Sequence, residues 1–334
     1  MPDSVQVILP ADCQPARRPG RLLSFEIATA VFIGFCSTVM AADTTVVIDG
    51  CTLFDSDLGT MVADQTIVIR DSRIIHVAGT DEVSDIPADA ARIDGRGKYA
   101  LPGFIDAHVH VVHVLDYAHV TGDEVLPLYL AAGVTSVRST GDEVVAATLV
   151  ARFAAAHPEF CPRVFTCSPL LDADPPIHRD IGRAVTDPLM VPALFDDLER
   201  WDITTVKIYA GTSRPVGRAI IEESHRRGLF VTAHLGKYSA QDAVADGVDG
   251  LEHIWSVFNY VIPAEITKQS GHRGRLDLDT PQCNSLVDAL VQRRVYVDPT
   301  LAVFRNMILL PDVAEVHDHP DNALVPKRLR DFWP

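Results

Sequence analysis

One stretch decides the fold: Leu101-Pro102-Gly103-Phe104-Ile105-Asp106-Ala107-His108-Val109-His110-Val111-Val112. Pro102 and Gly103 indicate a turn, and the apolar run after them is typical of a buried strand. Side chains alternate between the two faces of a strand, so His108 and His110 share one face. Two imidazoles in that arrangement can bind one metal ion, and the remaining sequence must supply the other ligands.

After this stretch, short apolar segments alternate with helical ones. Helical spacing of apolar residues predicts helices over 144–156 and 216–227, and a further helix is predicted over 239–246. Such alternation is typical of a parallel sheet with crossover helices, and we predict an α/β fold of the (β/α)₈ TIM-barrel type with strands 1–7 present. The predicted strands are 104–112, 134–139, 163–167, 205–209, 230–234, 250–254 and 295–299.

The segment before the barrel is rich in β-strand patterns. Short apolar runs begin at Val46, Thr66 and Arg73, and turns are predicted at Asp71-Ser72 and at 94–97. We interpret residues 42–102 as a small N-terminal β-sandwich part, which is too small to be very stable alone.

The first 41 residues resemble an export signal. Arg17, Arg18 and Arg21 precede a mostly apolar run over 22–39, and small residues at the end of the run predict cleavage after Ala41. This predicts a periplasmic or extracellular protein. The alternative is an uncleaved membrane anchor, because about 18 apolar residues are at the lower limit of a spanning helix.

Composition excludes several classes of partner. The 334 residues are 47% hydrophobic and 22% charged, which is typical of a globular protein. A formal net charge of −16 argues against binding to nucleic acid or to an anionic membrane surface. A homo-oligomer is left open. Because no CxxC occurs among the cysteines, a thiolate zinc site is not expected.

Later strands add polar residues at their ends. Lys207 lies among β-branched residues in the fourth predicted strand, and His234 and His253 end the fifth and sixth. A buried lysine has a lowered pKa, and its neutral amine can react with CO₂ to form a carbamate that bridges two metals. Four histidines and this carbamate on Lys207 could hold two divalent metal ions. Zinc suits imidazole ligands, and manganese, cobalt or iron could substitute.

The stretch 102–110 resembles the first-strand signature of the metal-dependent amidohydrolase superfamily. The segments 206–209, 232–234 and 250–253 are similar to its imidazolonepropionase-like and carboxylated-lysine Xaa-Pro dipeptidase branch. The resemblance implies that His108 and His110 bind the more buried metal, that the Lys207 carbamate bridges both metals, and that His234 and His253 bind the second. It also identifies 103–334 as an incomplete metal-dependent amidohydrolase barrel.

The sequence departs from this family at its end. The family has an aspartate at the end of strand 8, which binds the first metal and shuttles a proton, and no eighth strand is predicted here. Asp298 is an acidic residue at the equivalent position of strand 7, its carboxyl end, but it lies on a different strand. The chain is therefore expected to be truncated at the C-terminus.

The resemblance implies a hydrolase that cleaves a C–N bond in an amide or peptide-like substrate, with a metal-activated hydroxide and with Lys207 as the catalytic residue. It also implies that the partner is a small-molecule or dipeptide-like substrate. Tyr209 shares the face of Lys207 and either contacts substrate or packs at the barrel mouth. Arg138 either binds a substrate carboxylate or has a structural role. The alternatives are a non-catalytic fragment or pseudoenzyme that retains metal binding, and an ester or lactone hydrolase on the same barrel.

Overall fold

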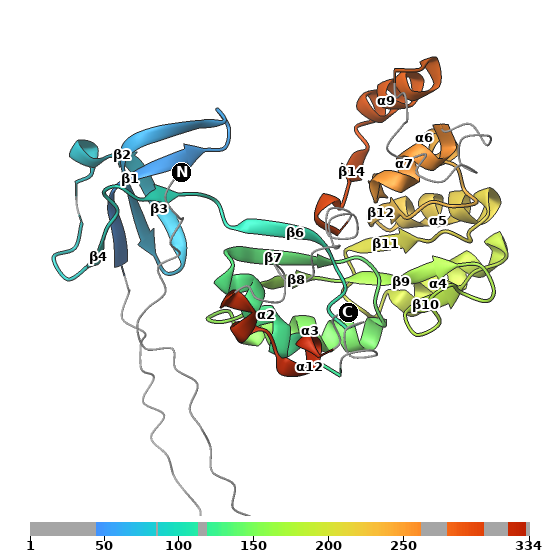
Figure 1. Cartoon of the computed structure of the whole chain (residues 1–334), viewed down its shortest axis with the longest axis horizontal. Coiled ribbons are helices and arrows are strands. Elements are labelled where there is room, and N and C mark those ends of the chain that lie inside the picture. Colours follow the sequence, from blue (N-terminus) through green and yellow to red (C-terminus); the bar gives the residue numbers. More distant parts are fainter. Residues whose placement is uncertain (1–44, 85, 113–118, 262–278, 304–319, 332–334) are drawn as a thin grey trace, which may run out of the picture. The chain divides into compact units, whose positions relative to one another are not determined.

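The computed structural model describes residues 45–84, 86–112, 119–261, 279–303 and 320–331. The chain divides into two compact units, Met1–Pro102 and Gly103–Pro334, and Figure 1 shows the elements of each. The predicted export signal over 1–41 lies outside the described residues. Among the helices of the described part, none is long and apolar enough to cross a membrane.

The N-terminal unit contains one mixed sheet of five strands. Its strands are β1 (Thr45–Asp55), β2 (Thr60–Arg70), β3 (Arg73–Gly79), β4 (Ala91–Asp94) and β5 (Tyr99–Ala100). The antiparallel order β3-β2-β1 is extended by β4 and β5, which both pair with β1 in parallel. Asp71 and Ser72 both have positive φ, as a two-residue turn between twisted strands requires, so the predicted turn is confirmed.

The C-terminal unit is an α/β structure in which all strand pairs are parallel. One sheet has the order β6-β7-β8, and the other has the order β10-β9-β11-β12-β13-β14. The strands are β6 (Phe104–Val109), β7 (Val134–Ser139), β8 (Arg163–Phe165), β9 (Cys167–Asp172), β10 (Gly182–Ala184), β11 (Thr205–Ile208), β12 (Phe230–Ala233), β13 (Gly250–Glu252) and β14 (Tyr296–Asp298).

All seven predicted strands are present, and the described residues form no closed barrel. The third predicted strand is split at Thr166, where β8 ends and β9 begins. β8 pairs with β7, whereas β9 pairs with β11, so this single residue separates the two sheets. β10 was not predicted from the sequence.

Helices connect the strands and cover the sheets. They are α2 (Gly122–Ala131), α3 (Val144–Ala156), α4 (Val191–Leu198), α5 (Arg214–Arg226), α6 (Ala240–Asp246), α7 (Ile254–Val261), α9 (Pro281–Arg293) and α12 (Lys327–Arg330), with short 3₁₀ turns at Thr80–Glu82, Pro188–Met190 and Pro320–Leu324. The predicted helix over 144–156 matches α3. α6 begins after Ser239, whose hydroxyl accepts a bond from the Asp242 amide, and ends at Gly247 with φ of 99°.

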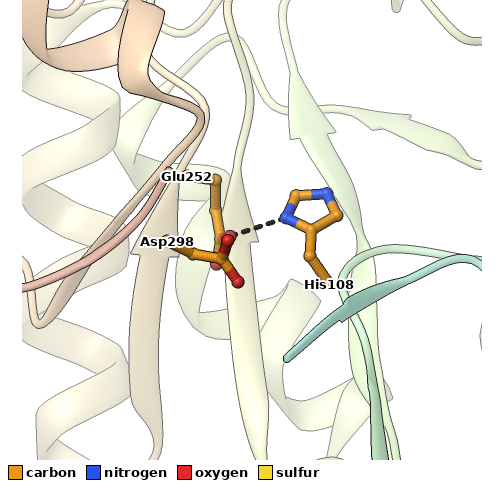
Figure 2. A group of neighbouring side chains, drawn as sticks. All are labelled: His108, Glu252 and Asp298. Carbon is orange, nitrogen blue, oxygen red and sulfur yellow. Dashed lines mark hydrogen bonds and ion pairs between the residues drawn. The ribbon is translucent and has the colours of Figure 1, made fainter. Parts of the chain in front are cut away.

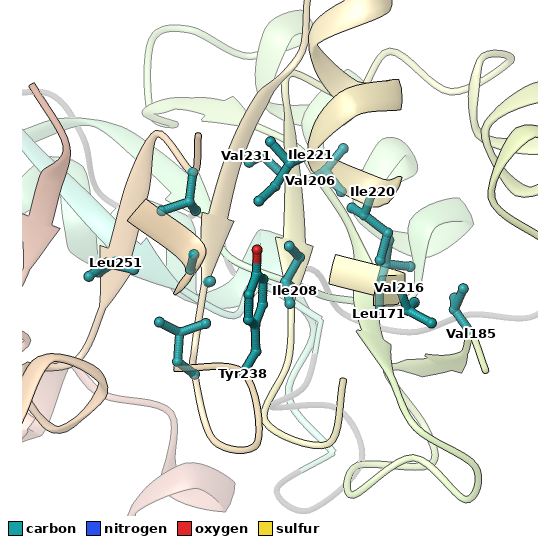
Figure 3. Close-up of a cluster of buried hydrophobic side chains, with 14 of the residues drawn as sticks. Leu171, Val185, Val206, Ile208, Val216, Ile220, Ile221, Val231, Tyr238 and Leu251 are labelled. Atoms are coloured by element: carbon teal, nitrogen blue, oxygen red, sulfur yellow. The ribbon is translucent and has the colours of Figure 1, made fainter. Parts of the chain in front are cut away.

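The larger sheet packs on α4, α5 and α6 through the main core (Figure 3). β11 and β12 contribute Ile208 and Val231, and α5 contributes Ile220. α5 buries only one face, because its polar residues fall on the side opposite to Ile220. α2 and α3 cover β6 and β7 through a second cluster, which includes Val109 and Leu126.

Replacing Ile220 with alanine is expected to lower the free energy of unfolding by about 2–5 kcal/mol, because the side chain is fully buried and leaves a cavity. The matched control is Glu222→Ala on the exposed face of α5, which is expected to change stability by less than about 1 kcal/mol. Urea unfolding of both variants measures the difference. Equal losses would contradict the assignment of the two faces of α5.

Candidate active site

The candidate residues lie where parallel strands end. His108 is in β6 with His110 just after it, Lys207 is in β11, and His234 and His253 directly follow β12 and β13. Carboxyl ends of parallel strands meet at one edge of a sheet, which is where ligands bind in folds of this class. His253 adopts a positive φ of 64°, so the chain turns sharply as β13 ends.

The two histidines of the first strand have fixed hydrogen-bond roles. His110 Nδ1 lies 2.8 Å from the Gly141 carbonyl, which can only accept, so Nδ1 carries the proton. His108 Nδ1 lies 2.7 Å from Glu252 Oε2 and donates to that carboxylate. In its neutral form, each ring therefore has its lone pair on Nε2, which is the form in which an imidazole binds a metal.

Lys207 is buried with 1% of its surface exposed. Among the described residues, its Nζ has no hydrogen-bond partner. Burial lowers the pKa of this amine from 10.5 to about 8, although the charge of Glu252 raises it. An orphaned buried amine of this kind is expected to react or to be modified, because leaving it charged and unpaired is unfavourable.

His234 and His253 are neutral at physiological pH. Burial, followed by the positive charge of Lys207, lowers the pKa of His234 to about 4. Burial, followed by the charge of His108, lowers that of His253 to about 3. In the described part of the chain His234 Nδ1 has no hydrogen-bond partner, while His253 Nδ1 lies 2.8 Å from Thr300 Oγ1.

The structure brings the four predicted histidines together. Ring centroids are separated by 5.6 Å for His108 and His110, by 4.5 Å for His108 and His253, and by 4.6 Å for His253 and His234. Lys207 lies close enough for its charge to lower the pKa of both His234 and His253. The ligand roles predicted for these five residues stay predictions, because only their proximity is described.

Tyr209 also lies beside this cluster. Its ring centroid is 4.7 Å from that of His234 and 5.5 Å from that of His178. Burial raises the pKa of its phenol, and the charge of Asp172 adds to this effect, so the hydroxyl stays protonated at neutral pH. Tyr209 is thus a hydrogen-bond donor next to the histidines, and contact with substrate remains a prediction.

Glu252 was not assigned a role from the sequence, and the structure places it at the centre of the polar network. Its side chain is 1% exposed and accepts bonds from His108, Arg138 and Thr232. Burial would raise the pKa of Glu252, but the charge of Lys207, the hydrogen bond from His108 and the charge of Arg138 hold it below its usual range. An acidic residue inside an apolar strand pattern is the sequence feature that could have revealed it.

Asp298 lies close to the same residues (Figure 2). Ligand atoms of His108, Glu252 and Asp298 all fall within 4.8 Å of one another, so these three could hold a metal ion. One oxygen of Asp298 accepts a bond of 3.1 Å from the Thr300 amide. Asp298, which lies on the seventh predicted strand and not on the eighth, is therefore within the cluster.

Comparisons with known proteins find similarity to hydrolases. The chain is 27% identical over 117 residues to an imidazolonepropionase from Cupriavidus necator, covering 35% of this chain and 27% of that protein. It is 43% identical over 47 residues to a dihydroorotase from an Anaeromyxobacter species, covering 14% of this chain and 10% of that protein. The matches thus span about a quarter or less of these relatives. No family model matches the sequence.

Solved structures extend the comparison over most of the chain. A Bifidobacterium longum protein assigned as a prolidase has a TM-score of 0.63 and 25% identity, over 86% of this chain and 68% of that one. The chain is similar to members of the amidohydrolase superfamily. A Xaa-Pro dipeptidase with methionine bound in its active site also shares the fold, with a TM-score of 0.61 at 19% identity over 86% of this chain and 73% of that one.

Proposed function

We propose that this chain carries the active centre of a metal-dependent hydrolase that cleaves a C–N bond in a small amide or dipeptide-like substrate. The observation that carries the proposal is the pair of orphaned buried nitrogens, Lys207 Nζ and His234 Nδ1, among three further imidazoles. A group of donor atoms with no protein partner fits a ligand that the chain itself does not supply.

The donor set fits two divalent metal ions. His108, His110, His234 and His253 are the imidazole ligands in the proposal, and zinc is the metal that suits them best. When bound, the ions polarise the substrate carbonyl and lower the pKa of water. The remaining steps rest on the side chains of this chain.

Lys207 contributes as its carbamate. With a pKa of about 8, about a tenth of the amine is neutral at pH 7, far more than for an exposed lysine. The neutral nitrogen forms a bond to the carbon of CO₂ and releases one proton, which leaves a singly charged group with two oxygens. This anion would give the ions a bridging ligand and would relieve the unpaired amine.

Asp298 is the carboxylate to which we assign proton transfer. Both oxygens of Glu252 already accept short bonds, so Glu252 has little capacity left to take a proton from water. Asp298 lies in the same cluster and can pass that proton to the leaving amine. Tyr209, with its protonated hydroxyl, is proposed to contact the substrate.

The two parallel sheets are proposed to form one wall of a (β/α)₈-type barrel. His108 of β6 contacts Glu252 of β13 at 2.7 Å although the two strands belong to different sheets, which supports curvature of the wall. The N-terminal sheet is proposed as part of a β-sandwich. Residues 1–41 are proposed as an export signal, with a membrane anchor as the alternative.

The experiment combines metal analysis with a substrate panel of Xaa-Pro dipeptides, N-acyl amino acids, cyclic amides, esters and lactones. The purified chain is expected to contain two divalent ions and to prefer the C–N substrates. His108→Ala is expected to lose metal and hydrolysis, because its Nε2 lone pair is a ligand in the proposal. The control is His225→Ala, which removes an exposed histidine paired with Asp249.

Less than one ion per chain, unchanged by His108→Ala, would refute metal binding. Two ions without hydrolysis of any substrate would instead favour a pseudoenzyme that retains metal binding. Preference for esters or lactones over amides would instead assign the chain as an ester or lactone hydrolase.

A further inference from the structure

We propose that Glu252 is a positioning residue, which holds His108 in the tautomer and orientation that present Nε2 to the metal, and that Arg138 holds Glu252 in turn. The metal part of this inference rests on the proposed function. The tautomer part concerns the metal-free protein and stands independently of it.

The hydrogen bonds of Glu252 determine which ring nitrogen of His108 carries the hydrogen. Oε2 lies 2.7 Å from His108 Nδ1, while Oε1 lies 2.6 Å from Arg138 Nη2 and 2.7 Å from Thr232 Oγ1. A carboxylate that receives an arginine bond is ionised and can only accept. His108 Nδ1 therefore carries the hydrogen, and the lone pair of the neutral ring is on Nε2.

The same bonds argue against Glu252 as a metal ligand. Its position beside His108 and Asp298 allows ligation by distance alone. A metal bound to Oε2 would take the acceptor of His108, and one bound to Oε1 would displace Arg138 or Thr232 inside a buried site. A carboxylate that orients a ligating histidine through its other ring nitrogen is the arrangement that metal sites commonly use.

Arg138 connects this carboxylate to the backbone beside His108. Its Nε donates a 2.7 Å bond to the carbonyl of Ala107, and its Nη2 donates to Glu252. One guanidinium therefore sets the distance between the β6 backbone and the end of β13, which are in different sheets. The planar fork of arginine makes two such bonds in a fixed geometry, which lysine would not reproduce.

The test is nitrogen NMR of the histidine rings in the metal-free full chain, with His108 assigned by comparison with His108→Gln. In the wild type, His108 is expected to show a single tautomer with the hydrogen on Nδ1. Glu252→Gln is expected to give a mixture of tautomers, because an amide both donates and accepts. Thr232→Val is the matched control: it removes another bond to Glu252 and should leave the tautomer unchanged.

A zinc titration of the same proteins gives the second readout. Glu252→Gln is expected to weaken zinc binding about 10- to 100-fold, the usual effect of removing a group that orients a ligand. Thr232→Val is expected to change it less than about 3-fold.

The outcomes separate this inference from the proposed function. A wild-type His108 with its hydrogen on Nε2 would overturn the positioning role, and this result does not depend on the folding of Glu252→Gln. Unchanged tautomer and zinc affinity in Glu252→Gln would overturn it as well. A Glu252-dependent Nδ1–H tautomer in a chain that binds no zinc would support the orienting contact and refute the metal-dependent function.

Discussion

Replacing Lys207 with methionine is expected to abolish hydrolysis and to raise the free energy of unfolding. Methionine fills a similar volume without an amine, so no carbamate can form, and hydrolysis should fall at least about 10²-fold. The same change removes a buried amine whose pKa is lowered from 10.5 to about 8. At neutral pH this should stabilise the metal-free protein by up to about 3 kcal/mol.

The gain in stability is expected to depend on pH with a definite sign. Because the pKa of Lys207 is lower in the folded chain, the unfolded chain binds more protons between about pH 8 and 10.5. Wild-type stability should therefore rise with pH through this window. The penalty is fully present below pH 8 and disappears above 10.5, so the advantage of the methionine variant should vanish there.

The measurement is urea unfolding of metal-free protein in CO₂-free buffer from pH 7 to 11, together with the hydrolysis assay. Lys98→Met is the control, because Lys98 is exposed and lies in the N-terminal unit. A methionine variant less stable than wild type at pH 7, or one that retains hydrolysis, would contradict the role given to Lys207.

Replacing Arg138 with methionine is expected to destabilise the chain by about 3 kcal/mol. Removing one partner of a buried ion pair leaves the other charge uncompensated, and Glu252 is only 1% exposed. The loss should fall at the low end of the usual range, because the charge of Lys207 also faces Glu252. The double variant with Glu252→Gln should recover part of it, since no buried charge is then left unpaired.

A double-mutant cycle by urea unfolding measures this coupling, which is expected to be about 1–3 kcal/mol. Arg218→Met is the control, because Arg218 makes an exposed ion pair with Glu222 on α5 and should change stability by less than about 1 kcal/mol. Additive losses in the two single variants would show that Arg138 and Glu252 act independently.

Local pattern was enough to predict most elements of the C-terminal unit. The strand over 134–139 and the helix over 144–156 have the bounds that their apolar spacing indicates. The break at Thr166 could not be predicted, because it arises where the pairing partner changes from β7 to β11, and the choice of partner is not encoded within the segment. The same limit explains why the sequence indicates one incomplete (β/α)₈-type barrel, whereas the described residues of this unit form two separate sheets.

The candidate site was predicted in part for a related reason. Histidines and a lysine at strand ends can be recognised in the sequence, because imidazole and amine groups can bind metals or react in any fold. Glu252 and His108 are 144 residues apart, and Arg138 and Glu252 are 114 apart, so no local pattern links them. Sequence alone gives Asp298 little weight, because it lies on the seventh predicted strand and the family's aspartate lies on the eighth. The pairing of β13 with β14 places Asp298 opposite Glu252.

The one-residue break at Thr166 has a consequence for local unfolding of the C-terminal unit. His108 and His110 belong to one side of that break, whereas Lys207, His234 and His253 belong to the other. The smaller hydrophobic cluster lies on the first side, and the larger one lies on the second apart from Val144 of α3. Amide hydrogens on the two sides are therefore expected to exchange as two separate cooperative units in the metal-free chain. Ligation across the break would merge them, so exchange in β7 and β12 should slow together on metal addition.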